Sequence, residues 1–365
     1  MRRVFCALFC GSAVLRTVNA APASVFESIV LQFPLYRFVL FCSNEKSCFC
    51  PFQERFYILI IVFGALNVDV VMPVRSFPKT GETMMSEDYI MRSGGKGSNQ
   101  AMAAVRAGAK TAMVGKVGDD AFGRRSLNNL KSQSVLGTGI AISERPTGCA
   151  TIWVDHDGQN KVVVSAGANL DAASEQIPDE ILTEKNTLLT QLEVPEEETF
   201  MLLRRAAEGG CRTILNAAPA VTTVPDDILH MLDVLIMNDV EAKQLAAHHK
   251  LQSRTLEAIA REFSRRGQLN CIITMGSKGA LAVTPEAEWI VPALQVEVVD
   301  TTGAGDCFCG VFAAAQEQGL SLPESLKRAA VAAGLSCRAM GAQAGMPFDD
   351  EIEEHLPKLA DPQKI

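Results

Sequence analysis

Two acidic residues bracket a glycine turn in the segment Asp300-Thr301-Thr302-Gly303-Ala304-Gly305-Asp306. The stretch from Cys307 to Gln318 is rich in Ala, Phe and Val and is followed by Gly319, which predicts a helix that starts near Asp306. Unpaired N–H groups in the first turn of a helix attract anions, and a carboxylate beside them can accept a proton from a hydroxyl. The segment therefore suggests phosphoryl transfer, with a simple helix cap at Asp306 as the alternative.

A second glycine turn precedes a second expected helix. The segment Ser93-Gly94-Gly95-Lys96-Gly97-Ser98-Asn99-Gln100 leads into the alanine-rich stretch Ala101–Ala109. It is not a Walker A loop, because Lys96 is followed by Gly97 rather than by Ser or Thr. Lys96 and Asn99 offer a cation and an amide that suit hydroxyl groups. Taken alone, the same turn is also compatible with a tight packing connection between a strand and a helix.

The elements that position these residues are predicted from apolar runs that alternate with helical patterns. Strand-like runs occur at Tyr57–Phe63, Ala112–Gly115, Thr187–Leu192, Thr213–Leu215, Val234–Met237, Cys271–Thr274, Gly279–Val283, Trp289–Pro292 and Val296–Val299. Such alternation predicts a mainly parallel sheet with helices on both faces, whose active site lies beyond the carboxyl ends of the strands. Gln191, Glu193, Asn216, Asn238 and Thr274 each follow an apolar run, so we expect them to converge on one crevice.

Two stretches break the alternation and indicate a small β lid. Val68–Ile90 and Thr147–Ala168 have the two-residue periodicity of strands. In the second stretch, a turn at Asp155–Asn160 separates two apolar runs. A lid that excludes water would suit an enzyme that must transfer a phosphoryl group without hydrolysing its donor.

These motifs together resemble the ribokinase branch of the phosphofructokinase-B type carbohydrate kinases over about residues 59–357. The resemblance rests on Gly94–Ala101 continuing through Thr111–Gly123, and on Asp300–Asp306 continuing to Phe308 and Gly310. Further landmarks follow in family order: Gly64–Asp69, Gln191–Glu193, Asn216–Pro219, Asn238–Glu241, Thr274–Gly279 and Gly341–Gln343. The resemblance implies a ribokinase-like three-layer α/β/α fold with a mainly parallel central sheet and a small β lid. It also implies phosphorylation of D-ribose at the 5-hydroxyl by Mg-ATP.

The resemblance assigns roles to individual residues. Asp306 is the expected general base, beside an anion hole formed by Gly303 and the backbone N–H groups of Ala304, Gly305 and Asp306. The expected sugar contacts are Asn67, Asp69, Gly95, Lys96, Asn99, Glu193 and Asp306. The expected ATP contacts are Asn238, Thr274, Gly276, Ser277, Lys278, Gly279 and Gly305.

Two metal sites are also implied by the resemblance. Asn238 and Glu241 would hold Mg²⁺ largely through water, although Asp239 stands where many relatives have Glu. An activating K⁺ would be held mainly by carbonyl groups at Asp300, Thr302, Ser336, Ala339, Gly341 and Gly345. Asn216-Ala217-Ala218-Pro219 departs from the common Asn-Pro-Ala-Pro, which could loosen that loop.

Other activities remain compatible with the sequence. The acceptor could be deoxyribose, another sugar or a nucleoside, and the chain could also be a non-catalytic sugar-binding relative. The partners that the resemblance implies are ribose, ATP and a second copy bound through the β lid. A formal charge of −8 with no basic run longer than a pair argues against nucleic acid, and we expect no membrane partner. His248-His249 is interpreted as a surface pair.

Residues 1–58 lie outside the resemblance and contain five of the 11 cysteines, Cys6, Cys10, Cys42, Cys48 and Cys50. Three interpretations compete for this extension: a secretory signal, an organelle transit peptide, or a mispredicted start, which we favour slightly. Zinc binding by the last three cysteines lacks a matching second pair. The six remaining cysteines look like reduced core residues, so we expect a cytoplasmic enzyme, or an organellar one if the extension is a transit peptide. Residues 358–365 are expected to form a C-terminal tail.

Overall fold

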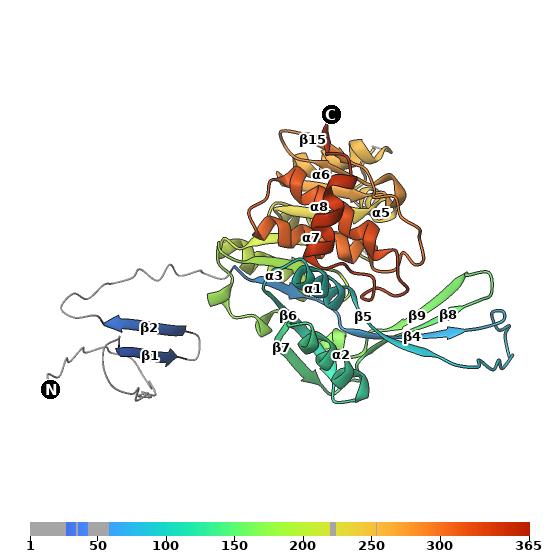
Figure 1. The fold of residues 1–365 in the computed structure, drawn as a ribbon. Helices are drawn as coiled ribbons and strands as arrows, with labels where there is room; N and C mark the ends of the chain where they lie inside the picture. Colours follow the sequence, from blue (N-terminus) through green and yellow to red (C-terminus); the bar gives the residue numbers. More distant parts are fainter. Residues whose placement is uncertain (1–26, 34–35, 43–57, 220–223, 253) are drawn as a thin grey trace. The chain divides into compact units, whose positions relative to one another are not determined.

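The computed structural model describes residues 27–33, 36–42, 58–219, 224–252 and 254–365. The chain divides into two compact units, Met1–Phe56 and Tyr57–Ile365. In the first unit, strands β1 (Glu27–Phe33) and β2 (Tyr36–Cys42) pair antiparallel (Figure 1). Residues 1–26, Cys48 and Cys50, on which the targeting and zinc interpretations rest, lie outside the described residues.

The main sheet of the second unit has ten strands in the order β16-β15-β14-β13-β12-β11-β10-β3-β6-β7. Their bounds are β3 Ile60–Phe63, β6 Thr111–Gly118, β7 Leu136–Ser143, β10 Thr187–Thr190, β11 Arg212–Asn216, β12 Val234–Asn238, β13 Asn270–Thr274, β14 Ala280–Val283, β15 Glu288–Val291 and β16 Gln363–Lys364. Neighbouring strands from β13 to β7 run parallel, whereas β14, β15 and β16 are antiparallel additions. The predicted mainly parallel sheet is confirmed.

Helices cover both faces of this sheet (Figure 1). The helices are α1 Lys96–Arg106, α2 Ala121–Ser132, α3 Glu196–Glu208, α4 Asp226–Leu229, α5 Asp239–His248, α6 Leu256–Gly267, α7 Ala304–Glu317, α8 Leu322–Ser336 and α9 Asp349–His355. Short 3₁₀ turns occur at Gly167–Asp171, Ser174–Gln176, Asp179–Ile181, Gly276–Lys278 and Leu356–Lys358. Among the described residues, no helix is both long and apolar enough to span a bilayer.

The side chains of a single buried strand show the three layers. Ile60 and Val62 of β3 pack in one apolar core with α1, α7 and α8. Ile61 and Phe63 pack in a second core with α3, α5 and α6. Successive side chains of a strand point to opposite faces, so the sheet lies between two helical layers. The α/β/α architecture that the sequence predicted is therefore confirmed.

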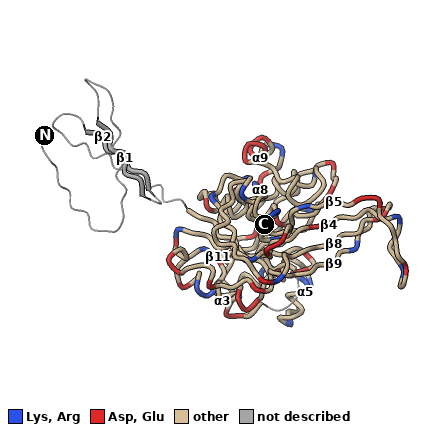
Figure 2. Tube along the Cα trace, turned by 90° about the horizontal axis from the view of Figure 1, so that it is seen from below, with Lys and Arg blue, Asp and Glu red and all other residues tan. Residues whose placement is uncertain are grey.

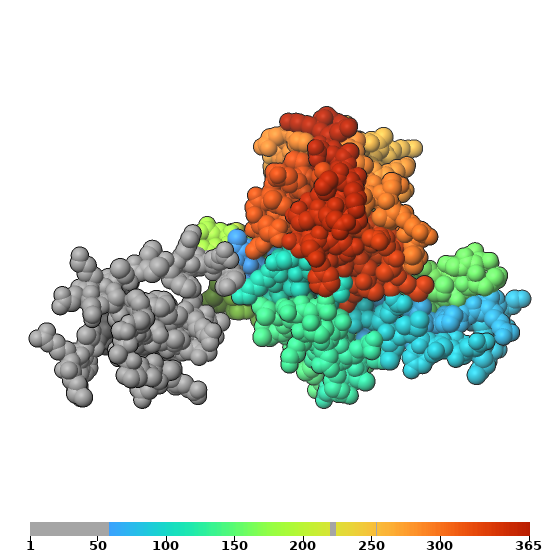
Figure 3. Space-filling view, in the orientation of Figure 1, coloured from blue at the N-terminus to red at the C-terminus, as the bar shows by residue number. Residues whose placement is uncertain are grey.

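A separate four-stranded sheet forms where the sequence predicted the β lid. Its order is β5-β4-β8-β9, with β4 Asn67–Pro73, β5 Ile90–Gly94, β8 Gly148–Val154 and β9 Asn160–Ser165. Asp155 accepts hydrogen bonds from the N–H groups of Asp157 and Gln159 and so closes the turn between β8 and β9. Figures 1 and 3 show these strands extending beyond the helices of the second unit.

Three local expectations differ from the structure. Val296–Val299 forms no strand, because the segment has left the sheet and the Val299 N–H instead binds the Cys337 carbonyl after α8. The tail expected at 358–365 is not separate, since β16 pairs with β15. His249 is not a surface residue: its side chain is 6% exposed, contacts Asp226 and packs edge-on against Phe263.

Candidate active site

The glycine turn before α7 creates an open helix N-terminus. Gly303 is the N-cap residue with φ of 78°, a conformation that favours glycine, and a Cβ there would lie 2.7 Å from the Ala342 side chain. Gly305 is exposed, and no atom lies within 4 Å of where its Cβ would be. Asp306 lies in the first helical turn and is 6% exposed. The capping interpretation of Asp306 is therefore wrong, because Gly303 holds that position.

One part of the expected anion hole is engaged within the chain. The N–H of Ala304 donates to the Thr301 carbonyl at 3.2 Å, closing the turn that precedes α7. Gly305 and Asp306 lie in the first helical turn, where backbone N–H groups have no acceptor within the helix. Gly305 and Asp306 thus offer open donors at the helix end, and the anion hole of three donors stays a prediction.

Two neighbouring amides of α1 hold the Asp306 carboxylate. Asn99 Nδ2 donates to Oδ2 at 2.9 Å, and Gln100 Nε2 donates to Oδ1 at 3.0 Å. The helices can approach this closely because position 310 of α7 is glycine: a Cβ there would lie 2.3 Å from the Gln100 carbonyl oxygen. The predicted glycine motifs therefore meet at one carboxylate.

Buried amides from three other segments of the chain extend this arrangement. Gln191 Nε2 donates to Gln100 Oε1 at 2.7 Å, and Gln100 Nε2 donates to Asn216 Oδ1 at 3.0 Å. Gln343 Nε2 donates to Asn99 Oδ1 at 2.9 Å. Gln191 and Asn216 were expected in this crevice because each follows a strand-like run, and their hydrogen bonds to Gln100 place them there. The role of Gln343 was missed, and the signal that could have found it was its place in the motif Gly341–Gln343.

The residues 216–218, at the end of β11, make hydrogen bonds to neighbouring segments despite their departure from the family pattern. Asn216 Nδ2 donates to the Ile236 carbonyl at 3.1 Å. The N–H of Ala217 also donates to that carbonyl, and the N–H of Leu192 donates to the Ala218 carbonyl, both at 2.9 Å. Hydrogen bonds therefore hold Asn216, Ala217 and Ala218, and the looser loop stays a prediction.

Lys96 is surrounded by carboxylates. The charge of Asp306 is the main cause that raises the pKa of Lys96, and Glu193 and Glu241 add to it against the opposing effect of burial. The backbone N–H of Lys96 donates to Glu193 Oε2 at 2.8 Å. Burial is in turn the main cause that raises the pKa values of Glu193 and Glu241. Glu193 is therefore no solvated strand end but a half-buried anchor for the start of α1.

Asp69 and Asn67 lie on β4, beside the glycine turn. Burial and, second, the charge of Asp306 raise the pKa of Asp69 to about 6. A Cβ at Gly94 would come within 2.3 Å of the Asp69 carboxylate, so glycine makes room for it. Asn67 is 5% exposed, and its Oδ1 accepts a hydrogen bond of 2.8 Å from Asn169 Nδ2, a partner that sequence reasoning missed.

The expected backbone contact at Gly95 also lies at this turn. Gly95 is the N-cap of α1 with φ of 88°, and a Cβ there would lie 2.6 Å from the Ala65 carbonyl oxygen. Any other residue would be strained and would also strike the backbone after β3. The sugar-binding candidates Asn67, Asp69, Gly95, Lys96, Asn99 and Glu193 are thus gathered where β4, β5, α1 and the segment after β10 meet Asp306.

Asn238 and Glu241, the magnesium candidates, form a capping box at the start of α5. Asn238 Oδ1 accepts from the N–H groups of Val240 and Glu241, and Glu241 Oε2 accepts from the Asn238 N–H at 2.8 Å. Among the described residues, no three His, Cys, Asp or Glu side chains cluster as a protein-held ion would need. Burial and the charge of Asp306 raise the pKa of Glu241, whereas the charge of Lys96 lowers it. A magnesium role for Asn238 and Glu241 stays a prediction.

The nucleotide candidates lie along the neighbouring strand. Thr274 ends β13 and is paired in register with Asn238 of β12. The turn that follows brings in Gly276 with φ of 57° and Gly279 with φ of 92°, where a Cβ would lie 2.0 Å from the Val291 carbonyl oxygen. Ser277 and Lys278, between these glycines, are exposed. The turn thus offers an accessible backbone at the carboxyl end of the sheet.

Asp300 organises the segment predicted to bind potassium. Its Oδ1 accepts from the N–H and hydroxyl of Thr302 at 2.9 and 2.7 Å, and its Oδ2 accepts from the Gly341 N–H at 2.7 Å. Burial opposes ionisation of Asp300, but these bonds and the charge of Arg92 outweigh it and hold its pKa below the usual value. Arg92, from β5, donates to the Met340 carbonyl.

The remaining potassium candidates lie at the end of α8 and in the loop after it. A Cβ at Gly345 would come within 2.1 Å of the Ser336 carbonyl oxygen, so these two backbones touch. Ala339 lies in the connection between α8 and Gly341 and is half-buried. The structure therefore groups Asp300, Thr302 and Gly341 by hydrogen bonds and Ser336 with Gly345 by contact.

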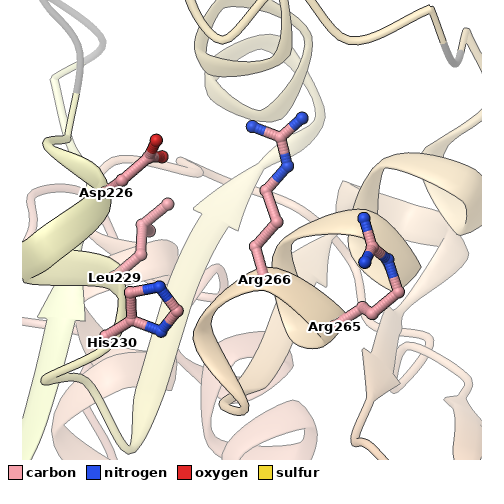
Figure 4. A pocket seen from close by; sticks show the side chains of 5 residues that line it. All are labelled: Asp226, Leu229, His230, Arg265 and Arg266. Carbon is pink, nitrogen blue, oxygen red and sulfur yellow. The ribbon is translucent and has the colours of Figure 1, made fainter.

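A cavity of about 340 Å³ lies elsewhere, between α4 and the end of α6 (Figure 4). Asp226, Leu229, His230, Arg265 and Arg266 line it. Both arginines pair with Glu262 and Asp226 contacts His249, so the charges of the lining are already compensated. Acidic and basic residues are likewise interspersed over the second unit (Figure 2). The cavity contains none of the residues around Asp306 and is not the candidate site.

Comparisons with known proteins agree with the geometry. Residues 58–349 match the family described as pfkB family carbohydrate kinase. The chain is 34% identical over 303 residues to a ribokinase of Lactococcus lactis, covering 82% of this chain and 97% of that protein. It is also 33% identical over 300 residues to a deoxyribokinase of Salmonella typhi, covering 81% of this chain and 98% of that protein.

Solved structures show the same likeness. A ribokinase from Thermotoga maritima matches with a TM-score of 0.78 and 33% identity, covering 83% of this chain and 100% of that chain. An Arabidopsis thaliana ribokinase complexed with ribose and ATP matches with a TM-score of 0.75 and 29% identity, covering 82% and 98%. The family match over 58–349 includes both glycine turns and the buried amides around Asp306.

Proposed function

Because this chain belongs to the pfkB family of carbohydrate kinases and is an ATP-dependent sugar kinase, we propose that its acceptor is D-ribose, phosphorylated at the 5-hydroxyl to give D-ribose 5-phosphate and ADP. The observation that carries the proposal is the placement of Asp306. Its carboxylate is buried, held by two amides, and next in sequence to the open space at Gly305. The acceptor itself is suggested by the relatives described as ribokinases.

In this mechanism Asp306 is the general base. A primary hydroxyl is a weak nucleophile at neutral pH, so its proton passes to the carboxylate as the new P–O bond forms and the bond to ADP breaks. The N–H groups of Gly305 and Asp306, at the positive end of the α7 dipole, stabilise charge on the transferring phosphoryl group. Asn67, Asp69, Lys96, Asn99 and Glu193 orient the sugar, and the four-stranded sheet covers it and excludes water.

Two cations complete the proposal. Asn238 and Glu241 would hold Mg²⁺ largely through water, and the ion would supply positive charge to neutralise the phosphates. Asp300, Thr302, Ser336, Ala339, Gly341 and Gly345 would hold a monovalent cation, K⁺, beside the helix end. The tied arrangement of Asp300 with Thr302 and Gly341 supports such a site. Turnover that is unchanged when K⁺ is replaced by tetramethylammonium would remove potassium from the mechanism.

The chain is also proposed to work as a dimer in the cytoplasm. Val162, Val163 and Val164 lie on the edge strand β9 and are exposed to solvent, which favours pairing with a second copy. The free cysteines of the second unit and the need for ATP favour a reducing, ATP-containing compartment. An organelle with these properties remains the alternative if residues 1–58 direct import.

A second acceptor is supported by one comparison, since the Salmonella typhi relative is described as a deoxyribokinase. The two sugars differ by one hydroxyl, and a site built to hydrogen-bond that hydroxyl would discriminate strongly against the sugar without it. Fructose or a nucleoside such as adenosine would need a differently shaped site. A non-catalytic sugar-binding relative would lack turnover with every acceptor.

The test is ADP release with Mg-ATP and K⁺ in the presence of D-ribose, 2-deoxyribose, fructose or adenosine. We expect ribose to give the highest kcat/KM, and Asp306→Asn to lower kcat by about 10³-fold without loss of the fold. Asp227→Asn, at an exposed ion pair with Arg204, is the matched control and should keep full activity. Preference for another acceptor would change the substrate, and no turnover with any acceptor would leave only a binding role.

A further inference from the structure

Gln100 is the most completely engaged side chain next to the base. It is fully buried, its Nε2 donates both to Asp306 Oδ1 and to Asn216 Oδ1 at 3.0 Å, and its Oε1 accepts from Gln191 Nε2 at 2.7 Å. A primary amide has two N–H donors and one carbonyl oxygen, so both donors and the acceptor are used. The side chain has neither space nor spare donors for a ligand.

The direction of the Gln100 amide is set by its partners. Asn216 donates its own Nδ2 to the Ile236 carbonyl, so its Oδ1 must accept. If the Gln100 amide were flipped, its oxygen would face the oxygens of both Asp306 and Asn216, and its nitrogen would face that of Gln191. Only one orientation therefore satisfies the group.

The orientation of the Gln100 amide also explains why one polar atom of Gln191 has no hydrogen-bond partner. Its Oε1 is buried and has no hydrogen-bond partner. The atom is also confined, since a Cβ at Gly64 would lie 2.0 Å from it. A native buried acceptor without a partner requires a reason, because desolvation disfavours it. Here the reason is that Gln191 must present its nitrogen, not its oxygen, to Gln100.

The two amides that hold Asp306 are not equivalent. Asn99 is a proposed sugar contact, and its bond to Asp306 Oδ2 can be shared with an arriving hydroxyl. Gln100 makes every bond it can make within the protein and stays on Oδ1. A carboxylate held through one oxygen by a fixed donor keeps its plane while the other oxygen reacts.

From this asymmetry we propose that Gln100, oriented by Gln191 and Asn216, is a positioning residue that holds Asp306 through Oδ1 and leaves Oδ2 to take the proton of the acceptor hydroxyl. The inference rests on the proposed function, in which Asp306 is the base. The proton moves from the sugar oxygen to Oδ2 as that oxygen bonds to phosphorus and ADP leaves. Gln100 itself neither gains nor loses a proton.

The test compares Gln100→Met and Gln100→Glu with the full-length parent. Both should lower kcat by about 10- to 100-fold, because the carboxylate loses its fixed donor, while KM for the sugar changes less than about threefold. The acid limb of the kcat/KM profile should move to higher pH by about 0.5–1 unit in Gln100→Met, since a carboxylate with one donor fewer keeps its proton to higher pH. It should move farther in Gln100→Glu, where a second acid faces the first.

Two further variants separate positioning from general destabilisation. Gln191→Met removes only the amide that orients Gln100, and it should show a smaller shift of the same limb. Gln316→Met removes a half-buried amide that binds Leu320 and Ser325 at the other end of α7, and it should leave the limb in place. Circular dichroism and urea unfolding show whether each variant folds.

Each outcome has one meaning. Absence of turnover by the parent with every acceptor overturns the proposed function. Turnover by the parent combined with an unmoved acid limb in both Gln100 variants overturns this inference alone, as does a change confined to KM. If Gln100→Met does not fold, Gln191→Met carries the test, and an unmoved limb there overturns the orienting role.

Discussion

At the scale of single residues, the site balances several carboxylates around one ammonium group. Lys96 lies among Asp306, Glu193 and Glu241, whose charges raise its pKa. Burial raises the pKa values of Glu193 and Glu241 more than Lys96 lowers them, so both pKa values stay above the usual value for Glu. Such shifts concentrate where charge is needed for chemistry rather than for stability. The partial burial of these acids therefore lowers the free energy of unfolding, and the size of this effect can be measured at Asp69.

Asp69→Asn should stabilise the protein at neutral pH. The pKa of Asp69 is raised from 3.8 to about 6, so the folded protein keeps a proton that the unfolded chain releases. The stabilising effect of this proton is complete below about pH 4 and is lost as the pH rises through 6. The variant should therefore be more stable than the parent by up to about 3 kcal/mol at pH 7.5 and equally stable near pH 4.

Urea unfolding of both proteins at pH 4 and 7.5 measures the effect. Asp88→Asn, at an exposed acid of the segment between β4 and β5, is a control that should change neither value by more than about 0.5 kcal/mol. A stability gain of the same size at both pH values would show that packing, not ionisation, is responsible. The ribose KM of Asp69→Asn should rise, because a proposed sugar contact is lost.

Residue types and spacing identified Asp306, Asn99 and Lys96 because glycine turns before helices leave a recognisable pattern. The same reasoning missed Gln100, whose value lies in three partners that come from other strands and helices. A glutamine on an alanine-rich helix has no distinguishing neighbour in sequence. The partners of buried amides depend on how the helices pack, so they could not be predicted from local pattern.

At the scale of elements, the approach of α1 to α7 decides whether the base meets its amides. The contact depends on Gly310, where a Cβ would lie 2.3 Å from the Gln100 carbonyl oxygen and 2.7 Å from the Ala103 side chain. Since the obstructing atom is backbone, a side chain cannot simply rotate away. One of the two helices would have to move.

Gly310→Ala should therefore affect both stability and turnover. Overpacking between the helices should lower the free energy of unfolding by about 1–3 kcal/mol, and displacement of Asp306 should lower kcat by about tenfold or more. Gly334→Ala crowds the Leu294 side chain from α8 and is the matched control. It should cost stability but leave kcat close to that of the parent. Equal kcat values for Gly310→Ala and the parent would show that α1 and α7 can separate without moving the base.

The N-terminus of α5 carries a second prediction at this scale, because Asn238 and Glu241 serve both a helix cap and a proposed magnesium site. Asn238→Ala should lose the cap and about 1 kcal/mol of unfolding free energy. Glu241→Gln can still accept the Asn238 N–H, so its stability should hold while the Mg²⁺ concentration for half-maximal rate rises several-fold. Urea unfolding and magnesium titration of activity separate the roles. An unchanged magnesium requirement in Glu241→Gln would show that Glu241 caps the helix and does not hold Mg²⁺.

Strands that contain a continuous apolar run were predictable from the sequence. Segments whose structure depends on distant partners were not. The predicted apolar runs match strands β3, β6, β10, β11, β12 and β13 in the sheet, because these parallel strands are mostly buried on both faces. The half-exposed parallel strand β7 was not predicted. Val296–Val299 has the composition of a strand but finds no neighbouring strand to pair with. Conversely, Gln363 and Lys364 lack an apolar pattern and form β16 because the edge of β15 offers hydrogen bonds.

At the scale of the whole molecule, the four-stranded sheet leaves an apolar margin exposed. Val162, Val163 and Val164 of β9 are 50%, 64% and 59% exposed, and β9 lies at the edge of its sheet. Figure 3 shows this part of the chain extending beyond the helices. An exposed apolar edge strand invites pairing with another chain. A second copy of this chain is the proposed occupant.

The final prediction concerns this edge. Light scattering at micromolar concentration should give the parent about twice the chain mass of 39.3 kDa. Val162 and Val164 share one face of β9 and Val163 faces the other, so Val163→Lys and the Val162→Lys, Val164→Lys pair probe the two faces separately. The lysine variant on the face that the second copy covers should have the mass of a monomer in the same light-scattering measurement. The reason is that burying a lysine ammonium without a paired charge is energetically costly. Met201→Lys, at a 46% exposed position of α3, should remain dimeric. A monomeric parent, or dimers in every variant, would place the contact elsewhere or remove it.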